Sequence, residues 1–373
     1  MSDRGQQRIC YVALQSVREG QAAHAHVHEI VQGLQKLGWR VSLHAAQTQP
    51  QDGMLRRVLA FLGVQLAAAA RMFSIQVLYV RWHAATAPIV LLAKLCRRRV
   101  VLEVNGTYSD IFLVWPALHR ISRCVTWLMR VQLRKADARI AVAPDLAKWV
   151  ETESGGKTCV VIPNGADPDR FRPDADPLSG VEPPYVAFVG ALSPWQGVDT
   201  MLDAVASPAW PKDVSLAIAG HGTESERAEE AASRNNAIQV LGVISYEDVP
   251  RLIAHGLCCL SVQGQALMQL RKDFSAIKVF ESLACGTPVI VSPYPSQKAL
   301  VEEAECGIVV PFDDADALAE AVAHLYANPE VRSSMGQRGR SVIISKHSWA
   351  ARARATDAVL TEVLAVGHRG EGL

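Results

Sequence analysis

Short apolar runs alternate with helix-length segments along almost the whole chain. In the first half, runs typical of buried strands lie at 8–15, 40–46, 75–82, 99–105, 139–143 and 158–164. Helix-length segments at 22–37, 54–72, 85–97, 117–135 and 145–153 separate them. Strands that are apolar on both faces are typical of parallel sheets covered by helices on each side. The alternation therefore predicts an α/β fold.

The alternation is interrupted once, at 167–184, and then resumes. The interrupting segment, DPDRFRPDADPLSGVEPP, is rich in Pro and Asp and follows no strand or helix period, so we predict a linker. Strand runs return at 185–192, 214–220, 238–242, 257–262, 287–293 and 307–311, and helical stretches at 313–327, 330–344 and 348–365 end the chain.

A chain of 373 residues is long for a single core. We predict two doubly wound, Rossmann-like domains, 1–175 and 176–345, that face a central cleft. We expect the final segment, 346–373, to be a helix that crosses back to the first domain. Open α/β sheets bind ligands outside the carboxyl ends of their strands, so each domain offers one such site.

The two halves of the chain carry opposite charge although the net charge is only +1. Residues 1–172 hold 23 Lys and Arg against 12 Asp and Glu, whereas the remainder holds 15 against 25. The basic half should attract phosphates, an anionic membrane face or nucleic acid. No zinc-finger or RNA-binding signature accompanies it, so we do not expect nucleic acid as a partner.

Two features bear on the cellular compartment. The eight cysteines are scattered without C-x-x-C spacing, which predicts reduced, mostly buried thiols. The opening stretch MSDRGQQRICYVALQ lacks an apolar signal segment, and no apolar run is long enough to cross a bilayer. We expect a cytoplasmic protein, with peripheral contact to the inner membrane face as an open alternative.

The stretch DFSAIKVFESLACGTPVIVSP contains charges in an otherwise apolar setting. We predict a largely buried helix over about 275–285, ended by Gly286, with Lys278 and Glu281 one turn apart on the same face. A buried carboxylate needs hydrogen-bond donors. Either the two charges form a surface ion pair of little consequence, or a ligand supplies what the protein withholds. A sugar diol would then face Glu281, and a diphosphate would face Lys278.

The stretch YVAFVGALSPWQGVD, residues 185–199, predicts a strand, a glycine-bearing turn and the start of a helix. Such a turn lets backbone N–H groups approach a phosphate, and the N-terminus of a helix favours negative charge. Glycine at a strand-to-helix turn also serves geometry alone, so this stretch by itself leaves both interpretations open.

Three stretches together resemble the family-4 retaining glycosyltransferases of GT-B fold. They are VIPNGADPDRFRP (161–173), FVGALSPWQGVD (188–199) and KVFESLACGTPVIVS (278–292), and a glycine-bearing loop and helix at 19–41 and a late Trp in HSWAARA (347–353) extend the likeness. The resemblance implies a retaining hexosyltransferase that uses a UDP- or GDP-sugar. It implies a glycan or lipid-linked acceptor, in the synthesis of cell-surface polysaccharide or glycoconjugate.

The resemblance also implies the roles of particular residues. Asp273, Lys278 and Glu281 would be catalytic, with Glu281 on the ribose hydroxyls and Asp273 at the first position of the family's E-x7-E motif. The diphosphate would lie against the loop 190–197 and the N-terminus of the helix that begins near Ser275. The donor-binding residues expected in this way are Gly190, Ala191, Gln196, Gly197, Val243, Ser275, Ala276, Ile277, Lys278 and Glu281.

The sequence departs from the family pattern where the donor's charge is bound. Ala191 and Gln196 stand where the family usually carries two cations. We hypothesise that Lys278, assisted by Arg271 or Lys272, neutralises the diphosphate instead.

On the acceptor side, Gly20, His24, Asn105 and Tyr108 are the expected contacts. Asn105 stands where the family often has a histidine at the end of the fourth strand. His24 and His28 are four residues apart, but no third ligand follows at a persuasive spacing for zinc. Solvated histidines on a helix remain the alternative for this pair.

No metal or cofactor is expected, since the nucleotide sugar is a substrate. Two D-x-D strings are present, at 174–176 and 314–316. The first lies in the predicted linker, and the second is typical of a helix N-cap followed by a first-turn acid.

Two basic amphipathic segments, 53–73 and 119–135, are compatible with docking on anionic lipid or with a packed helix that has a solvated basic face. Two other functions stay open at this stage. One is a nucleotide-sugar 2-epimerase of the same fold, and the other is a degenerate subunit that binds glycans without turnover.

Overall fold

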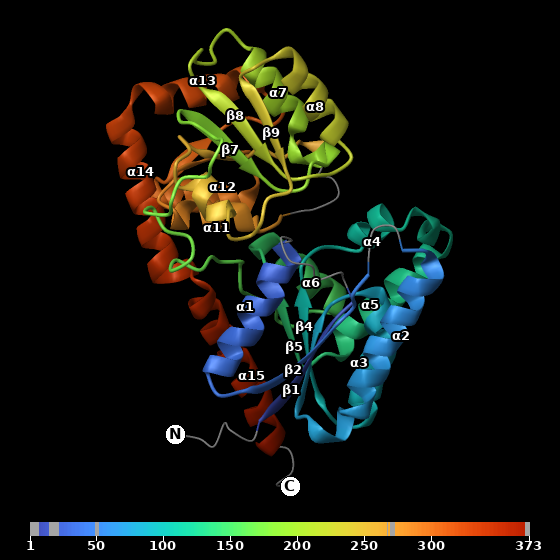
Figure 1. Cartoon of the computed structure of the whole chain (residues 1–373). Coiled ribbons are helices and arrows are strands. Elements are labelled where there is room, and N and C mark those ends of the chain that lie inside the picture. Colours follow the sequence, from blue (N-terminus) through green and yellow to red (C-terminus); the bar gives the residue numbers. More distant parts are fainter. Residues whose placement is uncertain (1–6, 15–21, 49–51, 267, 269–272, 370–373) are drawn as a thin grey trace. The chain divides into compact units, whose positions relative to one another are not determined.

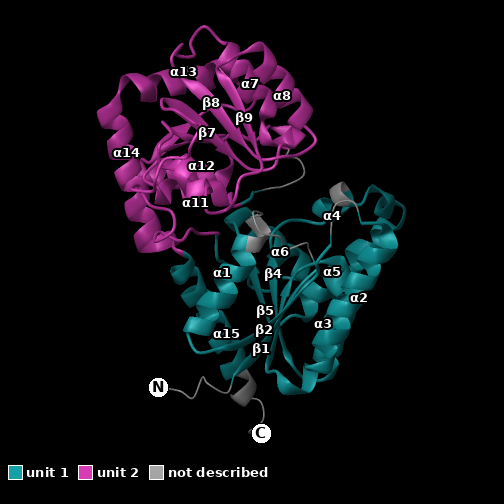
Figure 2. Ribbon diagram, viewed as in Figure 1, with its two compact units in different colours: residues 1–163, 270–274, 349–373 teal, residues 164–269, 275–348 magenta. Residues whose placement is uncertain are grey.

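The computed structural model describes residues 7–14, 22–48, 52–266, 268 and 273–369. The chain forms two compact units (Figure 2). Unit 1 comprises Met1–Pro163, Leu270–Phe274 and Trp349–Leu373, and unit 2 comprises Asn164–Gln269 and Ser275–Ser348. Each unit contains one six-stranded parallel sheet with helices on both faces, which confirms the predicted α/β class.

The sheet of unit 1 has the strand order β2-β1-β3-β4-β5-β6. Its strands are β1 (Arg8–Ala13), β2 (Arg40–Ala45), β3 (Val77–Arg81), β4 (Arg99–Val104), β5 (Ala138–Ala141) and β6 (Val160–Val161). All neighbouring pairs are parallel. β3 is buried along its whole length, which explains why its sequence is apolar on both faces.

Helices cover both faces of this sheet (Figure 1). On one face α1 (Ala22–Lys36) and α15 (Trp349–Arg369) lie side by side. On the other face α2 (Met54–Ala70), α3 (Ala87–Leu95), α5 (Ser122–Lys135) and α6 (Pro144–Ser154) pack over the main core. The short α4 (Ser109–Val114), which the sequence did not predict, follows β4.

The sheet of unit 2 has the order β12-β11-β10-β7-β8-β9. Its strands are β7 (Tyr185–Val189), β8 (Ser215–Ala219), β9 (Ile238–Gly242), β10 (Cys259–Ser261), β11 (Val289–Val291) and β12 (Gly307–Val309). One core packs α7 (Val198–Ala206), α8 (Ser225–Arg234) and α13 (Ala315–Ala327). A second core packs α9 (Val249–Ile253), α11 (Ile277–Ala284) and α12 (Pro295–Ala304), with α14 (Pro329–Val342) against α11.

The strand order reverses direction once in each sheet, and these points are where open α/β sheets bind ligands. In unit 2 the reversal lies between β7 and β10, because the chain runs outward from β7 through β8 and returns to β10 on its other side. The loops that follow β7 and β10 therefore meet at the carboxyl edge. In unit 1 the reversal lies between β1 and β3, and the loop after β1 falls outside the described residues.

The segment 167–184 is irregular, as predicted, but it is wrong to describe it as a linker. It belongs to unit 2, where Phe171 is completely buried. Arg340 on α14 donates to the Phe171 carbonyl at 3.0 Å and to the Pro168 carbonyl at 3.3 Å. The chain divides after Pro163, and the apolar Phe171 explains why the Pro-rich segment packs instead of spanning a gap.

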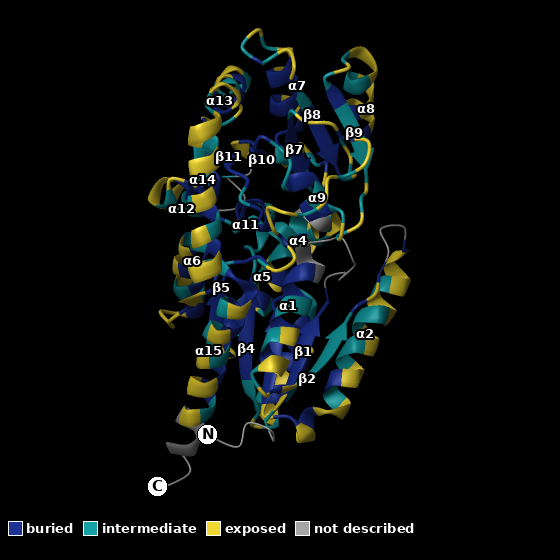
Figure 3. Ribbon diagram, turned by 60° about the vertical axis from the view of Figure 1, so that its left-hand side comes forward, coloured by how far each residue is buried: buried dark blue, intermediate teal, exposed yellow. Residues whose placement is uncertain are grey.

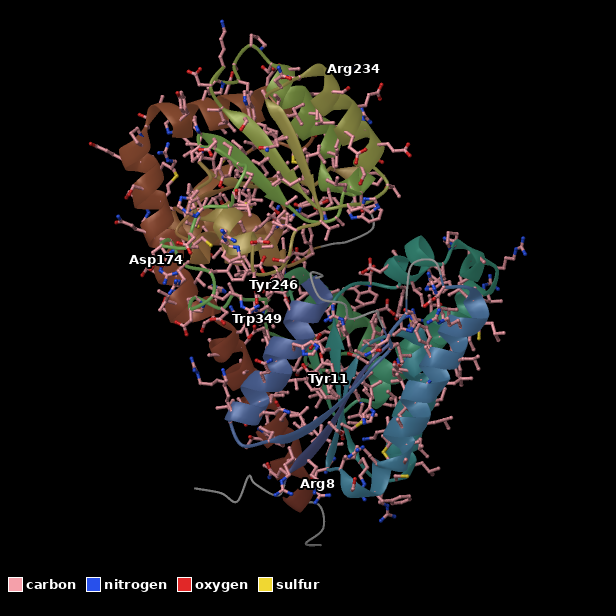
Figure 4. The ribbon with its side chains drawn as sticks, in the orientation of Figure 1. Arg8, Tyr11, Asp174, Arg234, Tyr246 and Trp349 are labelled. Carbon is pink, nitrogen blue, oxygen red and sulfur yellow. The ribbon has the colours of Figure 1, made fainter. Side chains whose placement is uncertain are left out.

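The final helix packs within unit 1. Trp39 donates its indole N–H to Asp357 of α15 at 2.8 Å, and Trp349 meets His26 of α1 edge to face at 5.4 Å. Figure 4 labels Trp349 at the start of α15.

Two local predictions, the cap before α13 and the free thiols, are confirmed. The Asp314 carboxylate accepts from the Ala317 N–H at 2.9 Å and caps α13, as predicted for the second D-x-D string. All eight cysteines are free thiols, six are buried and only Cys124 is exposed. No described helix combines the length and apolarity that a membrane-spanning segment requires.

Candidate active site

Helix α11 carries the two charges that the sequence singled out. It runs over Ile277–Ala284 and ends at Gly286, which adopts φ +72°, as the predicted glycine stop requires. Glu281 is only 6% exposed, and Lys278 is half-buried. The alternative of an exposed ion pair is therefore wrong, and the charges are held inside unit 2.

Glu281 has a partner that the sequence did not indicate. The hydroxyl of Tyr246, in the loop after β9, donates to Glu281 Oε1 at 3.0 Å (Tyr246 is labelled in Figure 4). The expectation that the protein withholds hydroxyl partners from this carboxylate is thus wrong. Arg170 lies 4.9 Å from the centre of the Tyr246 ring, so both the hydroxyl and the ring of the tyrosine make a contact. A tyrosine in an irregular loop carries no periodicity that could have revealed this contact.

Lys278 points toward the loop that follows β7. Its Nζ donates to Gln196 Oε1 at 3.2 Å and lies 3.9 Å from the centre of the Phe188 ring. Burial lowers the pKa of Lys278 to about 8. The ammonium therefore lies at the loop where the two expected cations are replaced by Ala191 and Gln196.

Two glycines shape that loop. Gly190 has φ +151°, and a Cβ there would stand 2.9 Å from Lys278 Nζ. Gly197 has φ +69°, and a Cβ there would stand 1.9 Å from the Val262 carbonyl oxygen. Only glycine fits at 197, because the β7 loop passes directly against the backbone that leaves β10. The loop thus lies at the strand reversal, with the Lys278 ammonium over its first residue.

A buried amide network supports the same loop. Gln263, just after β10, donates to Ser261 Oγ at 2.9 Å and, more weakly, to Gln196 Oε1 at 3.4 Å. Gln297, on α12, donates to Gln263 Oε1 at 3.2 Å. Sequence reasoning missed Gln263 and Gln297. Polar residues immediately after the buried run LCCLSV could have indicated the first of them, since strand ends at the carboxyl edge bear function.

The segment that precedes α11 is also held by hydrogen bonds. The helix begins at Ile277, after an Ala276 N-cap that makes no side-chain capping bond. Ser275 Oγ accepts from the Asn164 N–H at 3.0 Å, and its carbonyl accepts from Asn164 Nδ2 at 2.6 Å. The expected donor residues Ser275 and Ala276 therefore lie in a hydrogen-bonded segment that leads into the helix, and Ile277 is the first residue of the helix.

The remaining donor-side candidates are more dispersed. Ala191 is exposed, and Val243, after β9, is 76% exposed. Asp273 is 2% exposed, and its Oδ1 accepts from the Phe274 N–H at 2.9 Å. Asp273 belongs to unit 1 by its contacts, whereas Glu281 belongs to unit 2. Arg271 and Lys272, the proposed assistants of Lys278, lie outside the described residues.

In unit 1 the carboxyl edge holds a buried acid, Glu103 at the end of β4, which is 1% exposed. It is surrounded by His26 Nε2 at 2.9 Å, Arg81 Nη1 at 3.1 Å, Asn105 Nδ2 at 2.8 Å and the hydroxyls of Tyr11 at 3.1 Å and Tyr79 at 2.9 Å. Burial alone would raise the pKa of Glu103, but its neighbours His26, Arg81 and Asn105 hold that pKa well below its usual range. The sequence did not point to this acid, since it is embedded in the apolar run RVVLEVN.

The expected acceptor contacts are only partly described. Gly20 lies outside the described residues, and His24 lies in the first turn of α1. Asn105 is anchored on the buried Glu103. Tyr108 donates its hydroxyl to Glu153 at 2.9 Å and packs its ring on Trp149, 4.8 Å between centroids. Their contact with an acceptor stays a prediction.

Over the ranges that the structure describes, no three His, Cys, Asp or Glu side chains are grouped as a metal ion would require. Independence from metal remains an expectation.

Family models match the two halves of the chain in succession. The model described as Glycosyltransferase Family 4 matches residues 23–170, and the model described as Glycosyl transferases group 1 matches residues 170–342. The chain belongs to the family-4 glycosyltransferases. The resemblance predicted from the motifs around Gly197 and Glu281 is therefore confirmed.

Relatives of this glycosyltransferase include two enzymes of Mycolicibacterium smegmatis. A phosphatidyl-myo-inositol mannosyltransferase is 29% identical over 231 residues, which is 60% of this chain and 56% of the relative. A GDP-mannose-dependent alpha-(1-6)-phosphatidylinositol monomannoside mannosyltransferase is 26% identical over 305 residues, 73% of each chain. The first of these matches spans little more than half of the relative's length.

Among solved structures, sucrose-phosphate synthase from Thermosynechococcus elongatus is similar with a TM-score of 0.78. The likeness covers 96% of this glycosyltransferase and 100% of that chain, at 18% sequence identity. At this identity the likeness bears on the fold alone, and it confirms the GT-B class of two Rossmann-like units.

Proposed function

We propose that the chain transfers a hexose from a nucleoside diphosphate sugar to a glycan or lipid-linked acceptor, with retention of the anomeric configuration. The observation that carries this proposal is the position of Lys278. Its ammonium lies over the glycine-bearing loop at the strand reversal of unit 2, one helical turn from the buried Glu281. A cation, a loop that permits close approach and a buried acid on one edge suit a diphosphate joined to a ribose.

In this proposal Lys278 and Glu281 of unit 2 bind and orient the donor. Glu281, held by Tyr246, accepts from the ribose hydroxyls, and Lys278 pairs with the diphosphate. Asp273 contacts hydroxyls of the transferred sugar. Base contacts come from the loop after β9, where Val243 is exposed.

The main chemical task is to stabilise the departing diphosphate, because negative charge develops there as the glycosidic bond breaks. Lys278 supplies positive charge at that point. The bond from the anomeric carbon to the phosphate oxygen breaks, and a bond from the same carbon to the acceptor oxygen forms on the same face. The acceptor hydroxyl proton passes to the departing phosphate, so no separate base is required.

We propose GDP-mannose as the first donor to test, because one relative is named for its dependence on it. Both mannosyltransferase relatives are named for phosphatidylinositol-type acceptors, which supports a lipid-linked acceptor here. Action on such an acceptor would take place at a membrane surface. The charge excess of residues 1–172 supports peripheral contact with anionic lipid.

The test is a mass-spectrometric donor screen. UDP- and GDP-hexoses are incubated with the full chain and a pool of phosphatidylinositol, lipid phosphates and short glycans, and product anomers are assigned by NMR. We expect one donor to label one acceptor with retention, and Glu281→Ala to abolish labelling while Glu302→Ala, an exposed acid on α12, leaves it intact.

Three outcomes of the screen would contradict the proposal. Inversion of configuration would exclude retention. Appearance of a C2 epimer without acceptor would favour a 2-epimerase. Absence of both turnover and stabilisation by any nucleoside diphosphate would favour a non-catalytic subunit.

A further inference from the structure

Helix α2 presents an apolar stripe to solvent. Leu55, Leu59, Leu62 and Leu66 are 74%, 58%, 49% and 70% exposed. Their spacing places them on one face of the helix. Met54 and Val58 widen the stripe, and exposed Phe73 follows just beyond the helix. Figure 3 shows exposed positions recurring along the whole of α2. Single exposed leucines are ordinary, but a contiguous stripe of them marks an interaction surface.

The opposite side of α2 is already occupied by its own unit. Ala68 is completely buried, and Phe61 meets His83 edge to face at 5.6 Å. Arg57 lies 4.9 Å from the centre of the Trp115 ring. The helix therefore packs on the core of unit 1 through one face, and the leucine stripe lies on the other face.

The charge around the stripe is mostly positive. Between Asp52 and Glu103 the chain has no acidic residue, while it carries the cations Arg56, Arg57, Arg71, Arg81, Lys94, Arg97, Arg98 and Arg99. Four of these cations form ion pairs within the unit: Arg56 with Asp52, the buried Arg81 with Glu103, and Lys94 and Arg99 with Asp137. Arg56 and Arg71 lie at the two ends of α2, and Arg98 donates to the Phe73 carbonyl at 3.1 Å. An apolar stripe between cations matches an anionic lipid surface, in which negatively charged headgroups cover apolar acyl chains.

We propose that α2 lies in the plane of an anionic lipid surface, with Leu55, Leu59, Leu62, Leu66 and Phe73 inserted at the boundary between headgroups and acyl chains. This docking rests on the proposed function, because it would bring the chain to a lipid-linked acceptor. It assigns docking to α2 and not to the second basic segment. In α5 the exposed positions are Arg123, Cys124, Arg134, Lys135 and a single large apolar residue, Trp127.

A second copy of the chain is the main rival occupant, because the leucine spacing of four, three and four residues also suits a coiled-coil seam. Two copies paired through α2 would bring their arginines together. The helix itself contains no acid, and Asp52 just before it is already paired with Arg56 of its own chain at 2.9 Å. Charge complementarity thus favours lipid over self-association.

The test is flotation of the full chain with vesicles of phosphatidylcholine alone or with phosphatidylglycerol added. The double variant Leu59→Gln/Leu66→Gln removes two exposed leucines without removing helix propensity. We expect at least a tenfold lower partition coefficient, since each leucine withdrawn from water contributes about tenfold or more in the equilibrium. The matched control is Val331→Gln/Ile344→Gln, two exposed residues of unit 2, which should bind as wild type does.

Salt separates insertion from simple charge attraction. Raising the ionic strength should weaken wild-type binding to anionic vesicles without abolishing it, because the leucines are insensitive to screening. Arg56→Gln/Arg71→Gln should reduce binding mainly at low salt. GDP-induced thermal stabilisation should be unchanged in every variant, because α2 does not hold the donor.

Two results would overturn the inference. One is equal vesicle binding by wild type and the leucine variant, or no binding by either. The other is a dimer in sedimentation velocity that the same leucine variant dissociates, which would assign the stripe to a second copy. Transfer to a water-soluble acceptor, measured in parallel, separates the two proposals. If transfer to this acceptor occurs and vesicle binding does not, only the docking proposal is overturned. If vesicle binding occurs and no transfer is found, only the transferase proposal is overturned.

Discussion

Removal of the Lys278 ammonium is the sharpest perturbation that the site offers. Lys278→Met keeps an aliphatic stem against Phe188 and removes the charge, whereas Lys278→Arg keeps the charge. Lys298→Ala, an exposed lysine of α12 whose Nζ lies 3.8 Å from Glu302, is the matched control. Thermal unfolding of each variant checks that unit 2 remains folded.

The expected magnitude follows from the setting of the ammonium. Lys278 is half-buried and donates to a neutral amide oxygen, Gln196 Oε1. Burial lowers its pKa more than the Glu281 carboxylate raises it, so an arriving anion would stabilise the ammonium. A hydrogen bond to a charged group contributes roughly 1.5–3 kcal/mol. This corresponds to about 10- to 150-fold in donor affinity. We therefore expect Lys278→Met and Lys278→Ala to raise the donor KM or lower kcat by at least about tenfold, and Lys278→Arg to retain part of the activity.

The same lysine predicts a pH dependence. Burial lowers its pKa to about 8, so the free enzyme loses the cation as the pH rises through that value. The kcat/KM for the donor should fall above about pH 8 in wild type, because this ratio reports groups of the free enzyme. The decline should be absent from Lys278→Met. For stability the sign is opposite. The free energy of unfolding should rise with pH between about 8 and the ordinary lysine value of 10.5, because the unfolded chain binds more protons in that range.

The assay is initial-rate kinetics over donor concentration with the donor and acceptor found by the screen. Wild-type constants in both Lys278→Met and Lys278→Ala, with an unchanged pH profile, would refute the assignment of Lys278 to the diphosphate. An equal loss in Lys298→Ala would show that the effect is general and not local.

Three further predictions concern the supports of the two sites. Glu281→Gln should raise the donor KM about tenfold or more, and Tyr246→Phe about two- to tenfold, because the tyrosine only orients the acid. Isothermal titration with GDP checks both. Equal affinities in wild type and both variants would contradict the binding of the ribose by Glu281. Gly197→Ala should abolish GDP binding while Gly155→Ala, also at positive φ but with open space around it, should not; equal behaviour would show that loop closure at 197 is unimportant. Glu103→Gln should lower the free energy of unfolding, measured by denaturant titration, by about 3–5 kcal/mol. In wild type the contribution of Glu103 should persist from pH 7 down to roughly pH 4 and be lost only below, because the pKa of Glu103 is depressed in the folded state. An unchanged free energy of unfolding in the variant would contradict the buried charge cluster.

The fold was largely predictable because both its strands and its longer helices show a recognisable pattern of apolar residues in the sequence. Strands buried on both faces are apolar throughout, and the helices between them are long enough to show a 3.6-residue period. The short α4 escaped notice, since six residues are too few to show that period. The segment that carries Phe171 was misjudged, because its Pro and Asp residues say nothing of the one aromatic side chain that anchors it.

The proposed donor site was predictable where it lies on α11 and at the β7 turn, because a charge in an apolar helix and a glycine at a strand end both stand out. Its supports were not predictable. Tyr246 meets Glu281 across 35 residues, and Gln297 meets Gln263 across 34, and such contacts depend on strand order. The cluster around Glu103 was hidden for the same reason, since its members come from β1, β3, β4 and α1.

A crystal structure of the full chain with bound GDP tests the central claim most directly. The account predicts the diphosphate within hydrogen-bond distance of Lys278 Nζ and of the backbone N–H groups of the loop 190–197, with the ribose hydroxyls on Glu281. A nucleotide bound elsewhere would contradict it. So would a ribose directed away from Glu281 while that carboxylate keeps only its protein partners.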